Sequence, residues 1–278
     1  MTRFEDSDSD DADDFEIYKF LIINMDEFLN AIKYCTMKGK WGDKSGELSS
    51  QITCKIKDNN LYLLSANRAN SVAVAYRIVL RTNFENTEQN DVQFVLDLEV
   101  LPMLKTFSGE VEFIVDNDLT ILQGSDSATV PLVAHHENES AIDRFSPMLI
   151  DWINEGFGPD FTFGSTKYDL TVNLDADSLS QSIKACDTVG ASNYVLNFLH
   201  DFERLYLQAS KGQRKISKEL QMREHSGNAA TVPFAAPIHV LFQSKNEWDN
   251  RINLRLHDDM PLFASTDFAA IVVAPYMS

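Results

Sequence analysis

The sequence predicts a mixed α+β protein in which one structural module is written twice. Two observations support this. Residues 17–133 and 168–275 share the same order of elements, which is a strand, a short amphipathic helix, several strands, a second short helix and three closing strands. In both halves, apolar residues at helical spacing alternate with strand-like runs. A unit repeated at this length is typical of an assembly of modules rather than of a single catalytic pocket.

Length and composition agree with two globular domains. A chain of 278 residues with 44% apolar residues can build two cores of ordinary size. No stretch approaches the roughly 18 continuous apolar residues of a membrane span, and the N-terminus lacks the pattern of a secretory signal. Three cysteines without metal-ligand spacing predict reduced, buried thiols. We therefore expect an intracellular protein that does not bind membranes.

The net charge of −18 argues against a generally basic nucleic-acid-binding protein. It does not exclude lysines gathered on one surface, because the local field matters more than the total charge.

The chain divides into four segments by composition. Residues 1–15 form an acidic tail that is expected to be disordered, since residues 5–14 hold no apolar anchor except Ala12. Such a tail could dock a partner or be a functionless extension. Residues 16–133 make the first domain, and 168–278 the second. Between them, 134–167 form a long connector with a partly helical, apolar middle.

The first domain is predicted element by element. Met25, Phe28, Leu29 and Ile32 recur at helical spacing, so a helix follows the first strand. A second helix is predicted over 98–107, where Pro102 is tolerated only in the first turn. The predicted strands of this half are 17–23, 51–57, 61–65, 71–80, 94–96, 111–115, 119–122 and 128–133.

The second domain repeats this order. Leu179, Ile183 and Cys186 share one face of a helix, and 236–242 is the second short helix. Residues 214–223 alternate apolar and charged side chains, which suits a half-buried strand. The predicted strands of this half are 169–174, 194–199, 205–210, 214–223, 252–256, 261–264 and 269–273.

Four local segments, namely 64–72, 94–132, 260–262 and 271–275, occur in an order that resembles that of the DNA sliding clamp family. Residues 64–72 resemble the strand, turn and strand beside the family's partner pocket, and 260–262 the segment before its last hairpin. Residues 271–275 resemble the terminal aromatic-Leu-Ala-Pro of the eukaryotic and archaeal clamps, and 94–132 resembles bacterial clamp domains. The resemblance covers nearly the whole chain after residue 15. The long connector and Val272, where the family usually has tyrosine, depart from it.

The resemblance implies a duplicated DNA-clamp fold of the two-domain type, similar to proliferating cell nuclear antigen and phage clamps. Antiparallel sheets would lie outside, and two short helices of each domain would line a ring. The implied function is that of a DNA polymerase processivity factor, which encircles double-stranded DNA and tethers polymerase and other replication proteins. Six modules complete a ring in this family, so a two-module chain implies a homotrimer, opened by a clamp loader. A viral or archaeal source would fit the mixed traits.

The ring-lining helices of a clamp carry basic residues that face phosphates loosely. Each helix here has an associated lysine, and two turns add further basic residues. The alternative is that amphipathic helices place lysines on their solvated faces anyway. The predicted DNA-binding residues are Lys33, Lys38, Lys40, Arg68, Lys105, Lys184, Lys211, Arg214 and Lys245. By the same resemblance, strands 128–133 and 214–223 pair across the subunit interface.

Partner peptides of the family insert an apolar plug between the connector and the last hairpin. The alternative for these positions is ordinary core packing. Carried over position by position, the predicted partner-peptide pocket is Ala66, Val72, Met148, Leu149, Ile150, Pro261, Val272, Ala274 and Pro275.

Enzymatic functions are not indicated. His135 and His136 with Glu137 and Glu139 lack a second ligand pair at metal-binding spacing. No phosphate-binding loop, nucleophile elbow or paired helical histidine motif occurs. We expect no catalytic residue, no metal and no cofactor. Two other hypotheses stay open, namely a clamp-like interaction scaffold without a closed ring, and an unrelated two-domain α+β protein.

Overall fold

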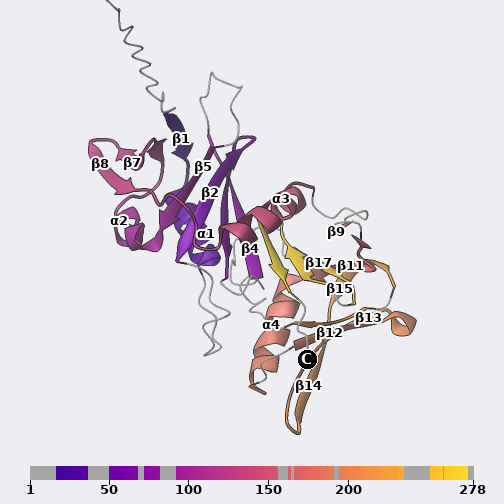
Figure 1. The fold of residues 1–278 in the computed structure, drawn as a ribbon. Coiled ribbons are helices and arrows are strands. Elements are labelled where there is room, and N and C mark those ends of the chain that lie inside the picture. The colour runs from indigo at the N-terminus through magenta and orange to yellow at the C-terminus, as the bar shows by residue number, and fades with distance from the viewer. Residues whose placement is uncertain are drawn as a thin grey trace, which may run out of the picture.

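The computed structural model of the protein describes residues 17–36, 50–67, 72–81, 92–155, 162–163, 166–190, 194–228, 230–234, 251–258 and 260–274. Its architecture is α+β, with antiparallel sheets and short helices packed against them (Figure 1). The predicted fold class is thereby confirmed. The predicted acidic tail (1–15) and the predicted helix 236–242 lie outside the described residues.

The first half follows the predicted order closely. Its second helix is short, and Pro102 lies in its first turn, where the missing N–H costs nothing. Most strands match the prediction to within one residue at each end, but β5 and β8 each begin two residues earlier than predicted. The elements are β1 (Tyr18–Ile22), α1 (Met25–Cys35), β2 (Gln51–Lys57), β3 (Asn60–Ala66), β4 (Val72–Val79), β5 (Val92–Asp97), α2 (Leu101–Leu104), β6 (Val111–Val115), β7 (Asp118–Gln123) and β8 (Asp126–Pro131).

The connector contains the helix predicted for its middle, which is longer than expected at 17 residues. The short strands β9, β10 and β16 were not predicted. The elements are α3 (Glu139–Glu155), β9 (Thr162–Phe163), β10 (Thr166–Lys167), β11 (Leu170–Asp175), α4 (Ala176–Asp187), β12 (Tyr194–Leu199), β13 (Arg204–Lys211), β14 (Arg214–Leu220), β15 (Met222–Gly227), β16 (Ala230–Phe234), β17 (Arg251–Leu256), β18 (Leu262–Ser265) and β19 (Ala269–Val273).

The prediction of one strand over 214–223 is wrong. The strand ends at Leu220, and the chain passes into another sheet, where it continues as β15. Backbone bonds at the crossing point hold it there: the N–H of Gln221 donates to Ser178 Oγ at 3.2 Å, and its carbonyl accepts from the N–H of Asp175 at 3.3 Å. Side chains alternate between the two faces in both β14 and β15, so the alternating sequence pattern gives no sign of the change of sheet at Gln221.

The main sheet joins the two halves of the chain. It has nine strands in the order β15-β11-β17-β18-β19-β4-β3-β2-β5. The junction is the antiparallel pair of β19 and β4, in which Val272 lies opposite Ala73. Two four-stranded sheets, β1-β6-β7-β8 and β14-β13-β12-β16, complete the architecture. Because the main sheet takes strands from both halves, the domain bounds 16–133 and 168–278 stay a prediction.

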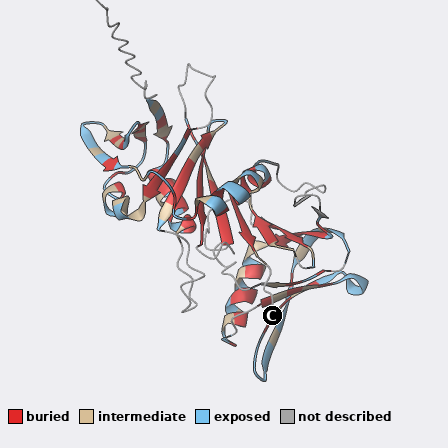
Figure 2. Cartoon of the chain, viewed as in Figure 1, coloured by how far each residue is buried: buried red, intermediate tan, exposed pale blue. Residues whose placement is uncertain are grey.

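Helices cover both faces of the main sheet. On β4, Val72, Val74 and Tyr76 belong to a large core cluster that also holds the buried residues of α1, α2 and α4. Ala73 and Ala75, which point the other way, belong to a second cluster beneath α3. In Figure 2, most residues in the central strands of this sheet are coloured as buried. The helices α1 and α4 therefore lie on the face opposite α3.

Local sequence features explain where these helices begin. The side chain of Asn24 accepts hydrogen bonds from the N–H groups of Asp26 and Glu27, which caps α1. Asp175 caps α4 in the same way, through the N–H of Ser178. The predicted turn between β2 and β3 is present, with Asp58 and Asn59 both at positive φ, as a two-residue hairpin of this hand requires.

Candidate functional site

Three of the predicted DNA-binding lysines lie on the helices that share the large core cluster. Lys33 on α1, Lys105 at the end of α2 and Lys184 on α4 are all exposed. Lys33 follows the buried Ile32, and Lys184 follows the buried Ile183, so each lysine points away from the core. The same helices also expose Asp26 and Asp177 in their first turns, and the helical surface is therefore of mixed charge.

The position of these lysines along the helices permits a purely structural role. Lys33 and Lys184 lie in the last turns of α1 and α4, where a positive charge stabilises the helix through its dipole. Their DNA-binding role stays a prediction. Four other predicted residues, namely Lys38, Lys40, Arg68 and Lys245, lie outside the described residues.

A second basic group surrounds the β13–β14 hairpin. Lys211 and Arg214 lie opposite each other at the two ends of its turn, and both side chains are exposed. Gly212 sits in this turn at a φ of +59°, a conformation that favours glycine. Along β14 the side chains of Lys215 and Lys218 are also exposed. The hairpin therefore presents a basic edge.

Among the described strands, each of the two four-stranded sheets ends in two outer strands, which are β1 and β8 in one sheet and β14 and β16 in the other. Of these, β8 and β14 each form one edge of their sheet. Each is mostly exposed. β14 carries Arg214, Lys215 and Lys218, whereas β8 begins with Asp126. An open edge of this kind is a ready template for pairing with another chain.

The predicted partner-peptide pocket lies at α3, and most of its residues are buried there. Ala66, Leu149, Ile150 and Val272 are all 3% exposed or less and share the second cluster. Met148 packs partly against this cluster. These side chains contact one another, so the chain's own helix takes the place expected for a partner's plug.

The remaining pocket residues lie apart from this group. Val72 belongs to the large core cluster on the opposite face of β4, so it cannot line one pocket with Ala66. Pro261 and Ala274 are half-buried, and the carbonyl of Pro261 accepts a hydrogen bond from the Tyr168 hydroxyl at 2.8 Å. Pro275 lies outside the described residues.

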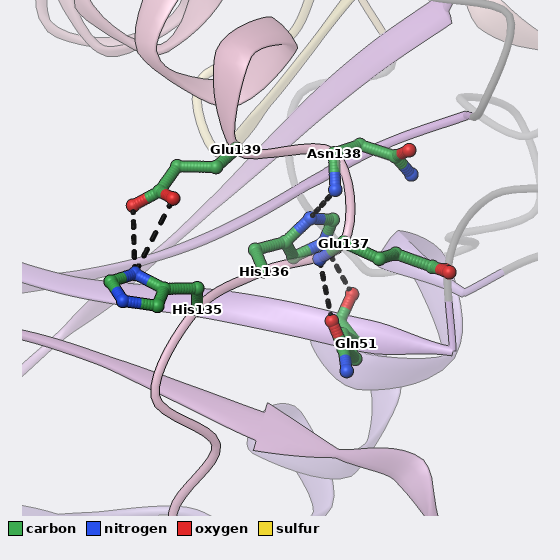
Figure 3. A network of polar contacts seen from close by, with 6 residues as sticks. All are labelled: Gln51, His135, His136, Glu137, Asn138 and Glu139. Atoms are coloured by element: carbon green, nitrogen blue, oxygen red, sulfur yellow. Dashed lines mark hydrogen bonds and ion pairs between the residues drawn. The ribbon is translucent and has the colours of Figure 1, made fainter.

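A polar network holds the N-terminal end of α3 (Figure 3). Asn138 donates from its side-chain nitrogen to the carbonyl of Ala66 at 2.9 Å. The N–H of Glu137 donates to the side-chain oxygen of Gln51 at 2.7 Å. His136 contacts the backbone carbonyl of Gln51 through Nε2 at 2.9 Å, and its Nδ1 accepts from the N–H of Asn138 at 2.9 Å. These bonds fasten the connector to β2 and β3.

The hydrogen bonds define the protonation state of His136. Since Nδ1 accepts a hydrogen bond, the ring proton sits on Nε2 and is donated to Gln51, which describes a neutral imidazole. Burial lowers the pKa of His136, although the bond to Gln51 and the charges of Glu137 and Glu139 raise it in part. His135, by contrast, is exposed and pairs with Glu139 at 3.4 Å.

The C-terminal end of α3 is held by a second set of bonds. The side-chain oxygen of Asn154 accepts from the Tyr62 hydroxyl at 2.9 Å and from Arg77 Nη1 at 3.1 Å. None of the three amide residues that hold the ends of α3, which are Gln51, Asn138 and Asn154, was predicted from the sequence to have a role. Single amides without a motif around them give no signal until the fold shows what they contact.

Groups that could support other chemistry are sparse in this fold. Within the described ranges, no three His, Cys, Asp or Glu side chains lie close enough to hold a metal ion. No described helix combines the length and the apolar character that a membrane crossing needs. Cys35, Cys54 and Cys186 are free and buried, as predicted, and burial raises the pKa of the Cys186 thiol to about 11.

Comparison with known proteins gives the fold a family context. No family model matches the sequence, and no curated protein sequence does. Among solved structures, the chain is similar to the A. fulgidus PCNA bound to the C-terminal region of FEN-1, with a TM-score of 0.66, 14% identity, and coverage of 95% of this chain and 99% of that one. For PCNA from Thermococcus kodakaraensis the values are 0.62, 14%, 94% and 100%.

Bacterial clamps give a similar result. A putative DNA polymerase III beta subunit from Eubacterium rectale has a TM-score of 0.68 and 12% identity, with coverage of 95% of this chain and 66% of that one. The chain thus spans the full length of the PCNA structures but about two thirds of the beta subunit. At these identities the likeness concerns the fold, which is that of the DNA sliding clamps.

Proposed function

We propose that this chain is a DNA sliding clamp, which closes as a homotrimeric ring around duplex DNA and tethers a polymerase and other replication proteins. The role is one of binding and holding, without catalysis, inside the cell. The clamp fold and the coverage of whole PCNA chains support it. A related structure is described as a PCNA2–PCNA3 complex from Sulfolobus tokodaii, so association of such chains has a precedent.

The observation that carries the proposal is the pair of open edges on β8 and β14. Within the chain, β19 pairs with β4 and joins the two halves. β19 is the last strand of the second half, and β4 follows β2 and β3. Their counterparts are β8, the last strand of the first half, and β14, which follows β12 and β13. Both counterparts are sheet edges among the described strands. Pairing β8 of one copy with β14 of the next would repeat the internal junction.

Two further features fit this pairing. The edges differ in net charge, because β14 carries Arg214, Lys215 and Lys218 with one carboxylate, Glu219, whereas Asp126 is the only charged residue of β8. Opposite charges steer two surfaces together and disfavour the wrong pairing of like edges. The junction between two copies would then be equivalent to the junction within one chain. The same rotation would relate each module to the next, so the modules would close into a ring. Three two-module chains would give the six modules of a clamp ring.

The proposed DNA-facing surface is that of α1, α2 and α4. These helices lie on the face of the main sheet opposite α3, and their exposed Lys33, Lys105 and Lys184 would meet phosphates. A few lysine side chains per subunit suit sliding, because they attract the phosphate backbone of DNA without contacting the bases.

Light scattering tests the ring. A mass three times that of the chain at micromolar concentration supports it, whereas a monomer contradicts the trimer and favours a scaffold that does not close. Retention on circular DNA, with loss from linear DNA, tests encirclement itself.

A matched pair of variants tests the DNA-facing helices. The triple change of Lys33, Lys105 and Lys184 to Ala removes the proposed phosphate partners. A control triple changes Lys19, Arg81 and Arg204, which are exposed and lie outside the helices, to Ala. Only the first triple should flatten the dependence of log K on log salt, by about 0.9 for each phosphate that the protein no longer neutralises. Equal slopes for the two triples would contradict the assignment.

A further inference from the structure

We propose that α3 is a displaceable occupant of a helix-binding groove, and that an amphipathic helix of a partner protein competes with it for the same seat. This inference rests on the proposed clamp function only for the partner's role in replication. The groove, its present occupant and the exchange between them are argued from the chain alone.

The floor of the groove is a patch of alanines on three adjacent strands. Ala66 on β3 lies directly opposite Ala73 on β4, and Ala75 on β4 lies opposite Ala270 on β19. All four are 1% exposed or less. Short side chains on one face of a sheet leave a channel between the larger residues beside them, and here that channel crosses the junction of the two halves.

The walls of the channel are bulky and apolar. Tyr62 and Leu64 on β3 stand on one side, and Phe263 on β18 with Val272 on β19 on the other, all in the same cluster. The Phe263 and Trp152 rings meet edge to face, with their centroids 3.5 Å apart. Removal of α3 would therefore uncover a shaped apolar surface rather than a flat one.

The face that α3 places in this channel defines the chemistry of a competitor. Ile142, Phe145, Leu149 and Trp152 recur at spacings of three and four residues and are buried, together with Ile153. This is the pattern of an amphipathic helix that binds in a groove. The outward face of α3 is polar and exposed, with Asp143, Arg144 and Asp151 among its residues.

Two features lower the intrinsic stability of the α3 helix, although the groove that binds it is well formed. Pro147 lies inside the helix, where it removes one backbone hydrogen bond and disfavours a straight helix. An isolated helix of this length with an interior proline is not stable in water, so α3 depends on the groove for its structure. A partner helix with the same apolar spacing and no proline would not carry that cost.

The polar anchors of α3 lie at its two ends. Asn138 holds the N-terminal end through Ala66, and Asn154 holds the C-terminal end through Tyr62 and Arg77. Between them, the described contacts of α3 with β3, β4 and β19 are those of apolar side chains. Loosening the two amides should therefore raise the fraction of molecules with an open groove while the sheet stays folded.

The test uses the full-length chain and a synthetic peptide, with no DNA or polymerase. The peptide has the sequence of residues 138–155 with Pro147→Ala and a fluorescent label. The test variant is the double change Asn138→Ala and Asn154→Ala. Asn197→Ala is the control, because Asn197 bonds Thr231 in another sheet. Fluorescence anisotropy should show at least about tenfold tighter peptide binding to the double variant than to the control, since apparent affinity scales with the open fraction.

Hydrogen exchange of the wild-type chain provides a second readout that needs no variant. The amides of α3 should exchange faster than those of β3, β4 and β19, because the helix opens locally. Exchange of α3 together with these strands, or equal peptide binding by the double variant and the control, would overturn the proposal. A peptide with Leu149→Glu should not bind, and binding by it would equally contradict a specific groove. None of these outcomes depends on ring formation, so they can fail while the clamp function holds.

Discussion

Arg77 and Asn154 lie 3.1 Å apart, guanidinium to side-chain oxygen, and this bond joins β4 to the end of α3. The same guanidinium donates to the carbonyl of Asp267 at 2.7 Å and lies over the Phe268 ring, 5.8 Å from its centroid. The backbone N–H of Arg77 donates to the carbonyl of Phe268, also at 2.7 Å. One residue of the first half therefore contacts the connector and the turn before β19.

This position predicts a stability effect for Arg77→Met, which keeps an apolar stem but loses both charge-assisted bonds. We expect the free energy of unfolding to fall by about 1.5–3 kcal/mol, the usual range for hydrogen bonds of charged groups. Urea denaturation checks this. Arg204→Met removes an exposed ion pair with Glu219 and should leave the unfolding midpoint unchanged. Equal midpoints for the two variants would show that the Arg77 junction contributes nothing.

His136 predicts a dependence of stability on pH. Its pKa in the folded chain is lowered by burial, below the ordinary value of 6.5. The unfolded chain therefore takes up this proton first as the pH falls. Its contribution to stability is complete above about pH 6.5 and is lost as the pH falls towards the folded pKa. Protonation would also place a hydrogen on Nδ1, against the N–H of Asn138 that it now accepts from.

Replacing His136 by Asn should remove part of this loss. We expect the wild-type chain to lose more unfolding free energy between about pH 7.5 and pH 5.5 than the His136→Asn variant does. His200→Asn serves as the control, because His200 is an exposed residue of the turn between β12 and β13. If His136→Asn keeps the full wild-type slope, the buried imidazole is not the titrating group.

The floor of the groove predicts the effect of a larger side chain. Ala75→Leu inserts bulk between β4 and α3, where Ala75 is fully buried, and overpacking of this kind costs about 1–3 kcal/mol. The groove should partly expel α3, so its amides should exchange faster than those of α1. Val79→Leu on the same strand is the control, since Val79 is 56% exposed. Faster exchange of α1 and α3 alike would indicate general destabilisation instead.

Much of the fold could be predicted from the sequence, because most strands are bounded by turn residues. The Asp58-Asn59 turn acts through neighbours in the sequence, as do the N-caps Asn24 and Asp175, although these two caps were not predicted. What failed was non-local. The change of sheet at Gln221 leaves no trace in a pattern of alternating side chains, and β16 is a short run whose pairing with β12 decides its structure.

The site was harder to predict than the fold. β4 is apolar on both faces, so periodicity identified a strand but not which face Val72 and Ala73 would each take. The partner-peptide pocket predicted from the family resemblance therefore combined residues from opposite faces of the main sheet. The amide anchors Asn138 and Asn154 carry no motif, since their role depends on partners 72 and 92 residues away in the sequence.

The charged edges predict how the proposed trimer should fail. β14 presents Lys215 and Lys218 at its open edge, and β8 presents Asp126. Charge reversal at both lysines (Lys215→Glu with Lys218→Glu) places like charges across the proposed seam, where each close like-charge pair is unfavourable. We expect the trimer to dissociate at protein concentrations at which the wild-type chain stays assembled, and light scattering over a dilution series measures this.

Two comparisons make this prediction specific. Lys19→Glu alters the charge on β1, which is the opposite edge of the β8 sheet, and should leave assembly intact. Adding Asp126→Lys to the reversed β14 edge should restore part of the association, because the seam again pairs opposite signs. Both effects should shrink at high salt, since exposed charges are screened within about 10 Å at 0.1 M. If the charge-reversed variant stays trimeric at low salt to the same dilution as the wild-type chain, the copies associate through another surface.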